Sequence, residues 1–339
     1  MKKIKNVVTK SFIAFTAVAG CFSLAACGGG TGDSAGTTQE ATTTASASST
    51  GRNLVINTYG TDEVFDSVPE RIFSVNYECA QMLLGLGLDD KIVGTTSAHF
   101  ALDALLPEYR SKIEALNTVG QSTAFEEILN NKPDFIFGHG WIFNEGGVAP
   151  QQDCIDNNIK YYAVTGTSGG KSTFEGVYDD LKNLGKIFEV EDKADEIIGG
   201  MKERLEKVKE NAVKDEPTIF VYDSGEKQAY TAGDLALQTE QIELVGAKNL
   251  FKDLNETYVE VSWEEVAKRN PDWILINEYE DENLTTTKTE FLKNNDALKD
   301  TNAIKNNHII SINLIELREG LQMVDGSEKL LKALNGEAY

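Results

Sequence analysis

The feature that most constrains the fold of this chain is a pattern that occurs twice. Residues 125–138 read FEEILNNKPDFIFG, and residues 263–276 read WEEVAKRNPDWILI. Each copy has an aromatic residue, two glutamates and an aliphatic residue, followed at the same spacing by Pro-Asp and an apolar run. Carboxylates favour the first turn of a helix, and a proline ends one. Because a short apolar run is typical of a buried strand, each copy predicts a helix followed by a strand.

Further agreement upstream of the two copies extends the repeat. The segments LLGLGLDDKIVG and IELVGAKNLF each combine a helix end, a glycine turn and a short apolar stretch, and each precedes one copy. We therefore predict an α/β fold of two similar lobes, in which helices follow most strands and the sheets are mainly parallel. The predicted strands are RIFSV, KIVGTT, DFIFG and KYYAV in the first lobe and TIFVYD, DWILIN and HIISI in the second.

A long amphipathic segment separates the two lobes. Apolar side chains at helical spacing line one face of residues 191–213, and Pro217 ends the segment. These side chains belong to Ala194, Ile197, Ile198, Met201, Leu205, Val208 and Val213. At 1.5 Å per residue the helix is about 35 Å long. A single helix of this length predicts a stiff connection between the lobes.

The N-terminus carries the marks of an export signal. Four lysines precede the apolar run SFIAFTAVAG, which is too short for a convincing transmembrane helix. The following Leu24-Ala25-Ala26-Cys27 resembles the bacterial lipobox, in which the cysteine receives a diacylglycerol group. A plain signal peptide with an incidental cysteine is the alternative. We predict that Cys27 is lipidated and anchors the mature chain outside the cell membrane.

The segment after Cys27 is composed mostly of glycine, serine, threonine and alanine. Such a segment cannot bury a core, so it predicts a flexible tether. The predicted organisation is a signal peptide over 1–26, a tether over 27–52, a first lobe over 53–170, a helical region with the bridging helix over 171–215 and a second lobe over 216–339.

Charge and cysteine content exclude several classes of function. The formal net charge is −22, and removal of a signal peptide with four lysines and no acid lowers it by four, to near −26. This charge argues against nucleic acid as a partner. Cys79 and Cys154 remain in the lobes, too few for a disulfide scaffold, and two free thiols are favoured over one disulfide. A cysteine-based metal site would need closer clustering.

The order and spacing of these segments resemble the substrate-binding lipoproteins of ABC importers for iron-siderophores, haem and cobalamin. The resemblance runs from about Asn53 to the C-terminus, through PERIFSVNYECAQMLLGLGLDDKIVGTT, both copies of the repeat, the long helix and AIKNNHIISIN. It implies two lobes bridged by a rigid helix, with a ligand cleft between them and only small closure on binding. It also implies a monomer without cofactor or catalytic residues, which delivers its ligand to an ABC permease and that permease's ATPase.

One acidic residue on each lobe aligns with the docking residues of this family. These are Glu126 and Glu264, which the repeat matches to each other and which in the family meet basic pockets on the permease. Two carboxylates at related positions make a two-point electrostatic key. The alternative is that they are only helix-terminal charges, worth less than about 1 kcal/mol each. The neighbours Glu127 and Glu265 fit that alternative better.

Ligands of parallel α/β lobes bind beyond the carboxyl ends of the strands. Reading past each predicted strand gives a candidate set in which aromatic side chains dominate. Its members are Tyr77, His99, His139, Trp141, Phe143, Asp223, Tyr230, Tyr279 and Arg318. The loop HGWIFNEGG is the most suggestive, although its aromatic residues could instead fold back on the core. Arg318 is the best cationic candidate for an anionic ligand edge, and a surface arginine is the alternative.

The candidate residues also bear on the ligand. Three histidines in the whole chain disfavour a bare metal site, although His99 or His139 could ligate a metal already held by a chelator. Aromatic walls with few cations, mainly Arg318 and Lys227, suit a near-neutral hydroxamate chelate or a corrinoid better than an anionic catecholate. We predict capture of an iron chelate, most simply a hydroxamate siderophore, with cobalamin or haem as alternatives.

Two functions of other classes compete with this interpretation. An extracellular enzyme would need a catalytic set, and the sequence has no nucleophile elbow, no paired metal ligands and no histidine near a plausible catalytic serine. A catalytic carboxylate pair stays open because acidic residues are abundant. A sensor or adhesin could use the same two lobes, and the neighbouring genes or a permease pull-down would separate it from a transport protein.

Overall fold

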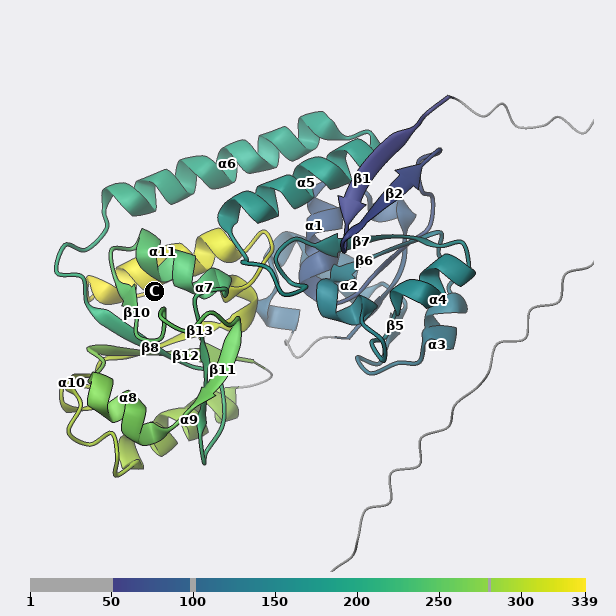
Figure 1. Cartoon of the computed structure of the whole chain (residues 1–339). Coiled ribbons are helices and arrows are strands. Elements are labelled where there is room, and N and C mark those ends of the chain that lie inside the picture. Colours follow the sequence, from purple (N-terminus) through teal and green to yellow (C-terminus); the bar gives the residue numbers. More distant parts are fainter. Residues whose placement is uncertain (1–50, 98–101, 280–281) are drawn as a thin grey trace, which may run out of the picture. The chain divides into compact units, whose positions relative to one another are not determined.

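Two parallel β-sheets, one in each half of the chain, organise the structure (Figure 1). The computed structural model describes residues 51–97, 102–279 and 282–339. The predicted lipidation site Cys27 and the cleft candidate His99 lie outside these ranges. Within them, no helix is both long enough and apolar enough to cross a membrane.

The described residues of the first half form a five-stranded sheet in the order β5-β4-β3-β6-β7, with all neighbours parallel. Along β6, Phe135 and Phe137 enter one apolar core and Ile136 enters another, so both faces of the sheet are buried. The strands are β3 (Ile72–Ser74), β4 (Ile92–Thr96), β5 (Thr118–Val119), β6 (Phe135–His139) and β7 (Lys160–Val164). The helices are α1 (Tyr77–Gly85), α2 (Pro107–Glu114), α3 (Phe125–Leu129), α4 (Gln151–Asp156) and α5 (Phe174–Phe188).

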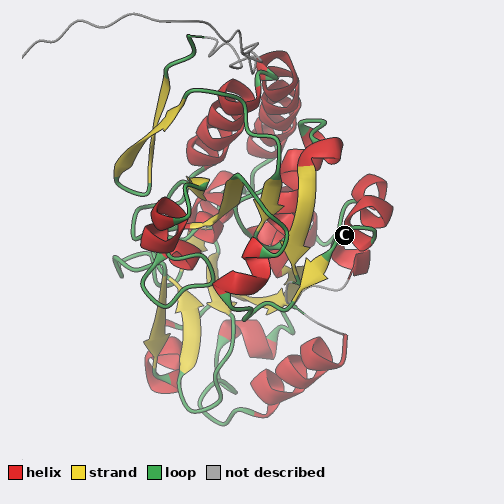
Figure 2. Ribbon diagram, turned by 90° about the vertical axis from the view of Figure 1, so that its right-hand side faces the viewer, coloured by secondary structure: helices red, strands yellow, loops and turns green. Residues whose placement is uncertain are grey.

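The second sheet, as far as the structure describes it, has four parallel strands in the order β10-β8-β12-β13. Ile274 and Ile276 of β12 face one core and Leu275 faces the other. The strands are β8 (Thr218–Tyr222), β10 (Lys248–Asn249), β12 (Trp273–Glu278) and β13 (Ile309–Asn313). The helices are α7 (Leu237–Leu244), α8 (Trp263–Arg269), α9 (Glu282–Asn294), α10 (Asn302–Lys305) and α11 (Met323–Leu334). Figure 2 shows helices on both sides of the strands.

Two antiparallel strand pairs in the described part of the chain were not predicted. One pairs β1 (Leu54–Thr58) with β2 (Thr61–Phe65), and the other pairs β9 (Ala229–Ala232) with β11 (Tyr258–Val261). In the second pair Tyr230 lies opposite Glu260, two residues from Tyr258, so the two tyrosines are diagonal neighbours on one face. Short 3₁₀ helices occur at η1 (Asp89–Lys91), η2 (Leu102–Ala104), η3 (Gly140–Phe143) and η4 (Leu314–Leu317).

The long helix α6 (Glu191–Glu210) connects the two halves (Figure 1). It begins at the predicted residue and ends at Glu210 rather than at Val213. Its buried face consists of Ala194, Ile198, Met201, Leu205 and Val208. It packs along α5 and against α11, where Arg204 pairs with Asp325 at 2.5 Å and with Glu328 at 2.8 Å. The predicted fold, two α/β lobes with parallel sheets and a long bridging helix, is confirmed.

The lobes also touch each other beyond the bridging helix. The core around α1 and α5 includes the C-terminal side chains of Met323 and Val324. The Gln81 amide donates to the Gln322 side chain at 2.8 Å. Further contacts join the segment before α5 to the segment around α7: Ser172 N donates to Leu235 O at 2.9 Å, Lys171 pairs with Asp234 at 2.9 Å, and Phe174 N donates to Glu240 at 2.7 Å. The lobes are therefore held together by direct packing as well as by α6.

Candidate functional site

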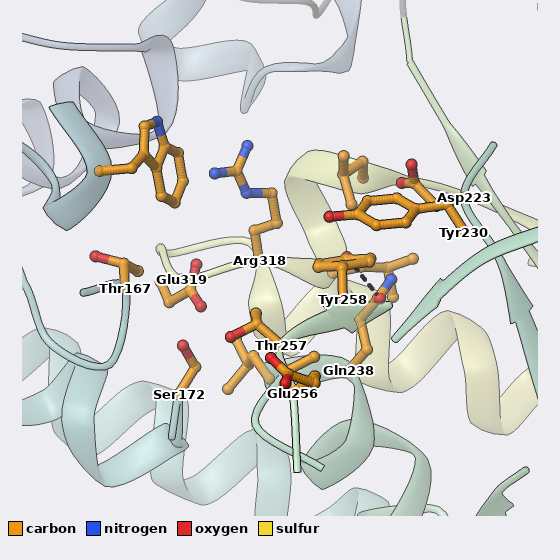
Figure 3. Close-up of a pocket in the computed structure, with 15 residues that line it drawn as sticks. Thr167, Ser172, Asp223, Tyr230, Gln238, Glu256, Thr257, Tyr258, Arg318 and Glu319 are labelled. Atoms are coloured by element: carbon orange, nitrogen blue, oxygen red, sulfur yellow. Dashed lines mark hydrogen bonds between the residues drawn. The ribbon is translucent and has the colours of Figure 1, made fainter. Parts of the chain in front are cut away.

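A cleft of about 400 Å³ lies where strands of both sheets end. Trp141 and Thr167 follow β6 and β7 of the first sheet, whereas Asp223 and Arg318 follow β8 and β13 of the second. The other lining residues are Ser172, Tyr230, Ala236, Leu237, Gln238, Glu256, Thr257, Tyr258, Leu314, Leu317 and Glu319 (Figure 3). The volume lies within the roughly 300–1,000 Å³ typical of small-molecule sites, and the position agrees with the rule for parallel sheets.

Trp141 forms an aromatic platform on the N-terminal side of the cleft. It stands in η3, where Ile142 and Phe143 turn into the core and leave the indole 42% exposed. The ring stacks on His139 with centroids 4.3 Å apart and planes 9° apart. The Arg318 guanidinium carbon lies 4.9 Å from the centre of the indole. A fixed imidazole and a guanidinium therefore position the platform before any ligand arrives.

A buried ionic group supports this platform and joins the lobes. His139 Nδ1 lies 3.8 Å from Glu78 Oε1, and His139 Nε2 lies 3.7 Å from Glu319 Oε2. Arg318 Nη1 lies 3.4 Å from the same Glu78 oxygen. Glu78 belongs to α1, whereas Arg318 and Glu319 follow η4. Within the described residues neither Glu78 oxygen nor His139 Nε2 has a hydrogen-bond partner, so electrostatic attraction across the lobes is their main compensation for burial.

The pKa of Glu319 shows how strong this attraction is. Burial of Glu319 favours the neutral acid, but His139 and Arg318 reverse that effect and lower the pKa of the Glu319 carboxyl to about 2. Burial likewise disfavours the charged Arg318 guanidinium, but Glu78 and Glu319 raise its pKa above the ordinary value. Arg318 and Glu319 are therefore both ionised at neutral pH, and each neutralises the other in part.

The opposite wall of the cleft is built on two stacked tyrosines. The rings of Tyr230 and Tyr258 have centroids 5.4 Å apart and planes 24° apart. The Tyr258 hydroxyl donates to Gln238 at 2.8 Å, and Gln238 donates to Asn277 at 2.6 Å. Asn277 in turn donates to the Asp223 carboxylate at 2.9 Å. This chain of hydrogen bonds fixes the orientation of the Tyr258 ring and of Asp223 at the end of β8.

A second layer behind this wall contains Tyr279 and a buried lysine. The Tyr279 hydroxyl donates to the Asp223 backbone oxygen at 2.8 Å and contacts its carboxylate at 3.2 Å. Lys288 of α9 donates to the Asn277 carbonyl at 2.6 Å and lies 3.8 Å from the centre of the Tyr279 ring. Burial lowers the pKa of Lys288 to about 8, although Asp223 and Glu278 oppose this effect.

Comparison with known proteins identifies the family. A family model described as a periplasmic binding protein matches residues 72–314, which is most of the chain. The chain belongs to the periplasmic binding protein family. This binding protein is 24% identical over 284 residues to an uncharacterized ABC transporter substrate-binding lipoprotein, YvrC, of Bacillus subtilis, covering 82% of this chain and 84% of the relative. It is 22% identical over 261 residues to the vitamin B12-binding protein of Vibrio campbellii, covering 75% of this chain and 85% of the relative.

Solved structures have the same fold. A periplasmic binding protein from Veillonella parvula superposes with a TM-score of 0.77 at 26% identity, covering 85% of this chain and 99% of that one. An ABC-type Fe³⁺-hydroxamate transport protein from Saccharomonospora viridis superposes with a TM-score of 0.73 at 22% identity, covering 83% and 99%. The two-lobe fold of this binding protein is therefore that of its family.

The structure brings some of the sequence-predicted residues together and not others. Four of them, Trp141, Asp223, Tyr230 and Arg318, line the cleft. His139 and Tyr279 lie behind it, where each contacts a lining residue. Tyr77 and Phe143 differ from expectation, because both are buried: Tyr77, the first residue of α1, lies in the apolar core of the first lobe, and the ring centroids of Phe143 and Tyr161 lie 5.3 Å apart. A residue that follows a strand end can turn to either side, and sequence alone does not decide which.

Several lining residues of this binding protein were missed by sequence reasoning. Tyr258 and Glu256 lie on or beside β11, which was not predicted, and Gln238 lies in α7. The segment TYVEV is rich in β-branched and aromatic residues, a composition that predicts a strand but not its pairing with β9. Glu319 follows Arg318 directly, and nothing in the sequence marks the acid as a partner of a distant histidine.

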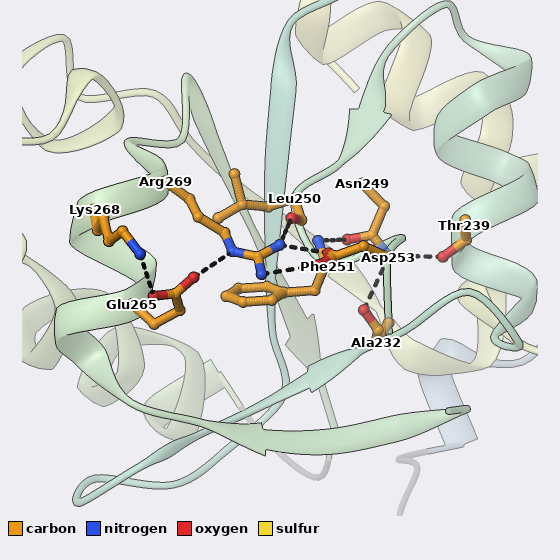
Figure 4. A network of polar contacts seen from close by, with 9 residues as sticks. All are labelled: Ala232, Thr239, Asn249, Leu250, Phe251, Asp253, Glu265, Lys268 and Arg269. Carbon is orange, nitrogen blue, oxygen red and sulfur yellow. Dashed lines mark hydrogen bonds and ion pairs between the residues drawn. The ribbon is translucent and has the colours of Figure 1, made fainter. Parts of the chain in front are cut away.

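The two predicted docking carboxylates differ from their neighbours. Glu126 in α3 and Glu264 in α8 are exposed, and no hydrogen bond or ion pair joins either side chain to another described residue. Glu127 instead accepts a hydrogen bond from Thr123 at 2.6 Å. Glu265 accepts from Arg269 at 2.9 Å, within the network drawn in Figure 4. In Figure 1 both helices lie on the side of the molecule away from α6.

The two cysteines of the lobes and the possible metal ligands were the remaining candidates for site chemistry. Cys79 and Cys154 are free and buried, and burial raises the pKa of both thiols. Cys79 Sγ lies 4.0 Å from His139 Nδ1. Among the residues that the structure describes, no group of three or more histidine, cysteine, aspartate or glutamate side chains is arranged to hold a metal ion.

Proposed function

We propose that this protein is the extracytoplasmic substrate-binding protein of an ABC importer, anchored by a lipid on Cys27. It captures an iron chelate, most simply a near-neutral hydroxamate siderophore, and delivers it to the permease and its ATPase. Family membership supports the transport role, as does the Bacillus subtilis relative, which is named as an ABC transporter substrate-binding lipoprotein. The fold shared with an Fe³⁺-hydroxamate transport protein agrees with the ligand class. The protein acts as a monomer, without catalysis and without nucleic acid.

The observation that most supports this ligand class is that the charge of Arg318 is already compensated. Among the described lining residues it is the one cation, and Glu78 and Glu319 already compensate its charge. Lys227, the other predicted cation, is exposed and is not among the lining residues. A ferric tris-catecholate carries several negative charges and would need free cations in the cleft. Aromatic walls and hydrogen-bonding side chains suit a chelate without that charge.

A corrinoid is the second candidate. The Vibrio campbellii relative is named as a vitamin B12-binding protein, and Trp141 and the tyrosine pair place aromatic rings on both sides of the cleft. Haem has less support, because no histidine is among the described lining residues, which leaves Tyr230 as the candidate axial ligand. His139 is buried beneath Trp141, and His308 stacks on Trp273.

A binding panel tests the proposed function. The mature protein is titrated with a ferric trihydroxamate, a ferric tris-catecholate, cyanocobalamin and haemin, with thermal unfolding as the readout. A ligand present at 100 times its dissociation constant should stabilise the protein by about 2.7 kcal/mol. Stabilisation by the trihydroxamate but not by the catecholate supports the proposal, whereas stabilisation by cyanocobalamin alone selects the corrinoid. Chemical conversion of any bound ligand during incubation would indicate an enzyme instead.

Docking to the permease completes the proposal. Glu126 and Glu264 are the carboxylates that the permease recognises, and their freedom from internal partners supports this role. They occupy corresponding positions in the two copies of the repeat, one on each lobe. Because α6 and the contacts between the lobes fix their separation, a permease with two basic pockets can recognise the spacing as well as the charges.

A further inference from the structure

The cleft carries an excess of negative charge. Its lining includes the carboxylates of Asp223, Glu256 and Glu319, and among the described lining residues Arg318 is the one cation. Arg318 is already paired, since its Nη1 lies 3.4 Å from Glu78 Oε1. The guanidinium is therefore not free to compensate a ligand or the other acids.

The three carboxylates that line the cleft differ in the hydrogen bonds and ion pairs that they already make. Glu319 already interacts with the buried ionic group, because its Oε2 atom lies 3.7 Å from His139 Nε2. The Asp223 carboxylate accepts hydrogen bonds from the neutral donors Asn277 and Ser224, and neither donor brings a positive charge. Glu256 is exposed, and its side chain has no hydrogen bond or ion pair with another described residue. Asp223 and Glu256 are thus the acids available to a ligand.

Lys288 offsets this charge only in part. It lies in the layer behind Asp223, where its ammonium donates to the Asn277 carbonyl and contacts the Tyr279 ring. Together with Glu78 and the cleft lining, four carboxylates stand against the cations Arg318 and Lys288, and they stay in excess even when the His139 imidazole is counted as a third cation. A ligand that enters the cleft meets a negative potential.

The aromatic wall between the two available acids suits a cation. Tyr230 is 39% exposed and stacks on Tyr258, so the pair presents aromatic surface to the cleft. Figure 3 shows Asp223 on one side of the tyrosine pair and Glu256 on the other. Aromatic faces attract ammonium groups through the ring quadrupole, and nearby carboxylates add Coulomb attraction. Neither feature favours a carboxylate, phosphate or catecholate at this wall.

We propose that the ligand carries a positively charged arm, such as a protonated amine, which binds against Tyr230 and Tyr258 between Asp223 and Glu256. This proposal rests on the proposed function and narrows it to a cationic chelate. The chelated metal and its apolar frame lie nearer Trp141, and the arm reaches the C-terminal wall. The selection is electrostatic: a neutral analogue of the same shape loses the attraction, and an anionic one is repelled.

The test compares two ferric chelates that differ only in this charge. One is a linear ferric trihydroxamate with a free primary amine, and the other is the same chelate with the amine acetylated. Calorimetric titration of the mature protein should give about tenfold tighter binding of the amine form, and the ratio should shrink at high salt. In the Asp223→Asn, Glu256→Gln double variant the ratio should fall to near one. The matched control is Glu210→Gln, an exposed acid at the end of α6 outside the cleft lining, which should keep the ratio.

The outcomes separate this proposal from the function on which it rests. Equal binding of the two chelates, or tighter binding of the acetylated one, overturns the cationic arm and leaves hydroxamate capture standing. If the amine form still binds more tightly than the acetylated form in the double variant, the proposal is also overturned, because the charge effect then comes from other residues. Binding of neither chelate, with binding of cyanocobalamin or haemin, overturns hydroxamate capture itself.

Discussion

The pH dependence of stability should depend on one buried carboxyl, Asp180 of α5. Its side chain has no solvent exposure, and it accepts hydrogen bonds from the Tyr162 hydroxyl at 2.8 Å, from Thr165 N at 3.1 Å and from Thr165 Oγ1 at 2.5 Å. Burial outweighs these bonds and raises the pKa of Asp180 from 3.8 to about 7. We predict that the wild-type protein loses stability as the pH rises to neutral and alkaline values. Asp180→Asn, whose amide resembles the protonated acid, should not show this loss.

The sign follows from proton binding in the two states. Between about pH 4 and pH 7 the unfolded chain has an ionised Asp180 while the folded protein keeps its proton, so the folded state binds more protons and stability falls as pH rises. The contribution is full below the unfolded pKa of 3.8 and is lost as pH rises through the folded pKa of about 7. Between about pH 5 and pH 8 the loss amounts to roughly 2–3 kcal/mol, at 1.36 kcal/mol for each unit of pKa difference.

Urea unfolding followed by circular dichroism measures this effect. The free energy of unfolding is determined at several pH values for the wild type, Asp180→Asn and the control Asp179→Asn. Asp179 is the adjacent carboxyl, 60% exposed and paired with Lys182 at the surface. The difference between wild type and Asp180→Asn should change by the predicted amount, and Asp179→Asn should follow the wild type. A difference that stays constant with pH would refute the reasoning, because the hydrogen bonds would then outweigh burial.

Three further predictions concern the ligand, the permease and the membrane. Trp141→Ala should weaken ligand binding by about 1–3 kcal/mol in calorimetry, because the aromatic platform is lost, and unchanged affinity would exclude this loop from the site. Glu126→Arg or Glu264→Arg should spare ligand affinity but cripple uptake, whereas Glu127→Arg should support uptake; normal uptake with both docking charges reversed would reduce them to helix-end carboxylates. Cys27→Ala should release the protein from the membrane fraction or block its processing, and unchanged retention with normal processing would contradict lipidation.

The parallel sheets could be predicted because their strands are buried on both faces. Segments such as DFIFG and DWILIN are continuous apolar runs, and each became a central strand of its sheet. The amphipathic helix α6 could also be predicted, because its apolar side chains recur at helical spacing. The antiparallel strand pairs were missed because their strands are short, and the partners β9 and β11 are separated by α7 and β10. Local pattern alone does not specify a pairing across such a gap.

The candidate site could be predicted only to the level of strand ends. Trp141 and Phe143 are two residues apart in one loop, yet one lies at the cleft and the other in the core. Packing decides this, because the 3₁₀ turn after β6 directs Ile142 and Phe143 inward and leaves the indole outside. The charge of Arg318 was visible in the sequence, but its neutralisation by Glu78 depends on residues far apart in the chain.

The ionic group beneath Trp141 bears on how the protein selects its ligand. Separating the lobes would break the contacts of Glu78 and His139 in the first lobe with Arg318 and Glu319 in the second. The same opening would expose Met323 and Val324, which pack in the core around α1 and α5. Wide opening is therefore expensive, and we expect the cleft to keep its walls nearly fixed. Discrimination among ligands must then come from the chemistry of those walls rather than from the extent of closure.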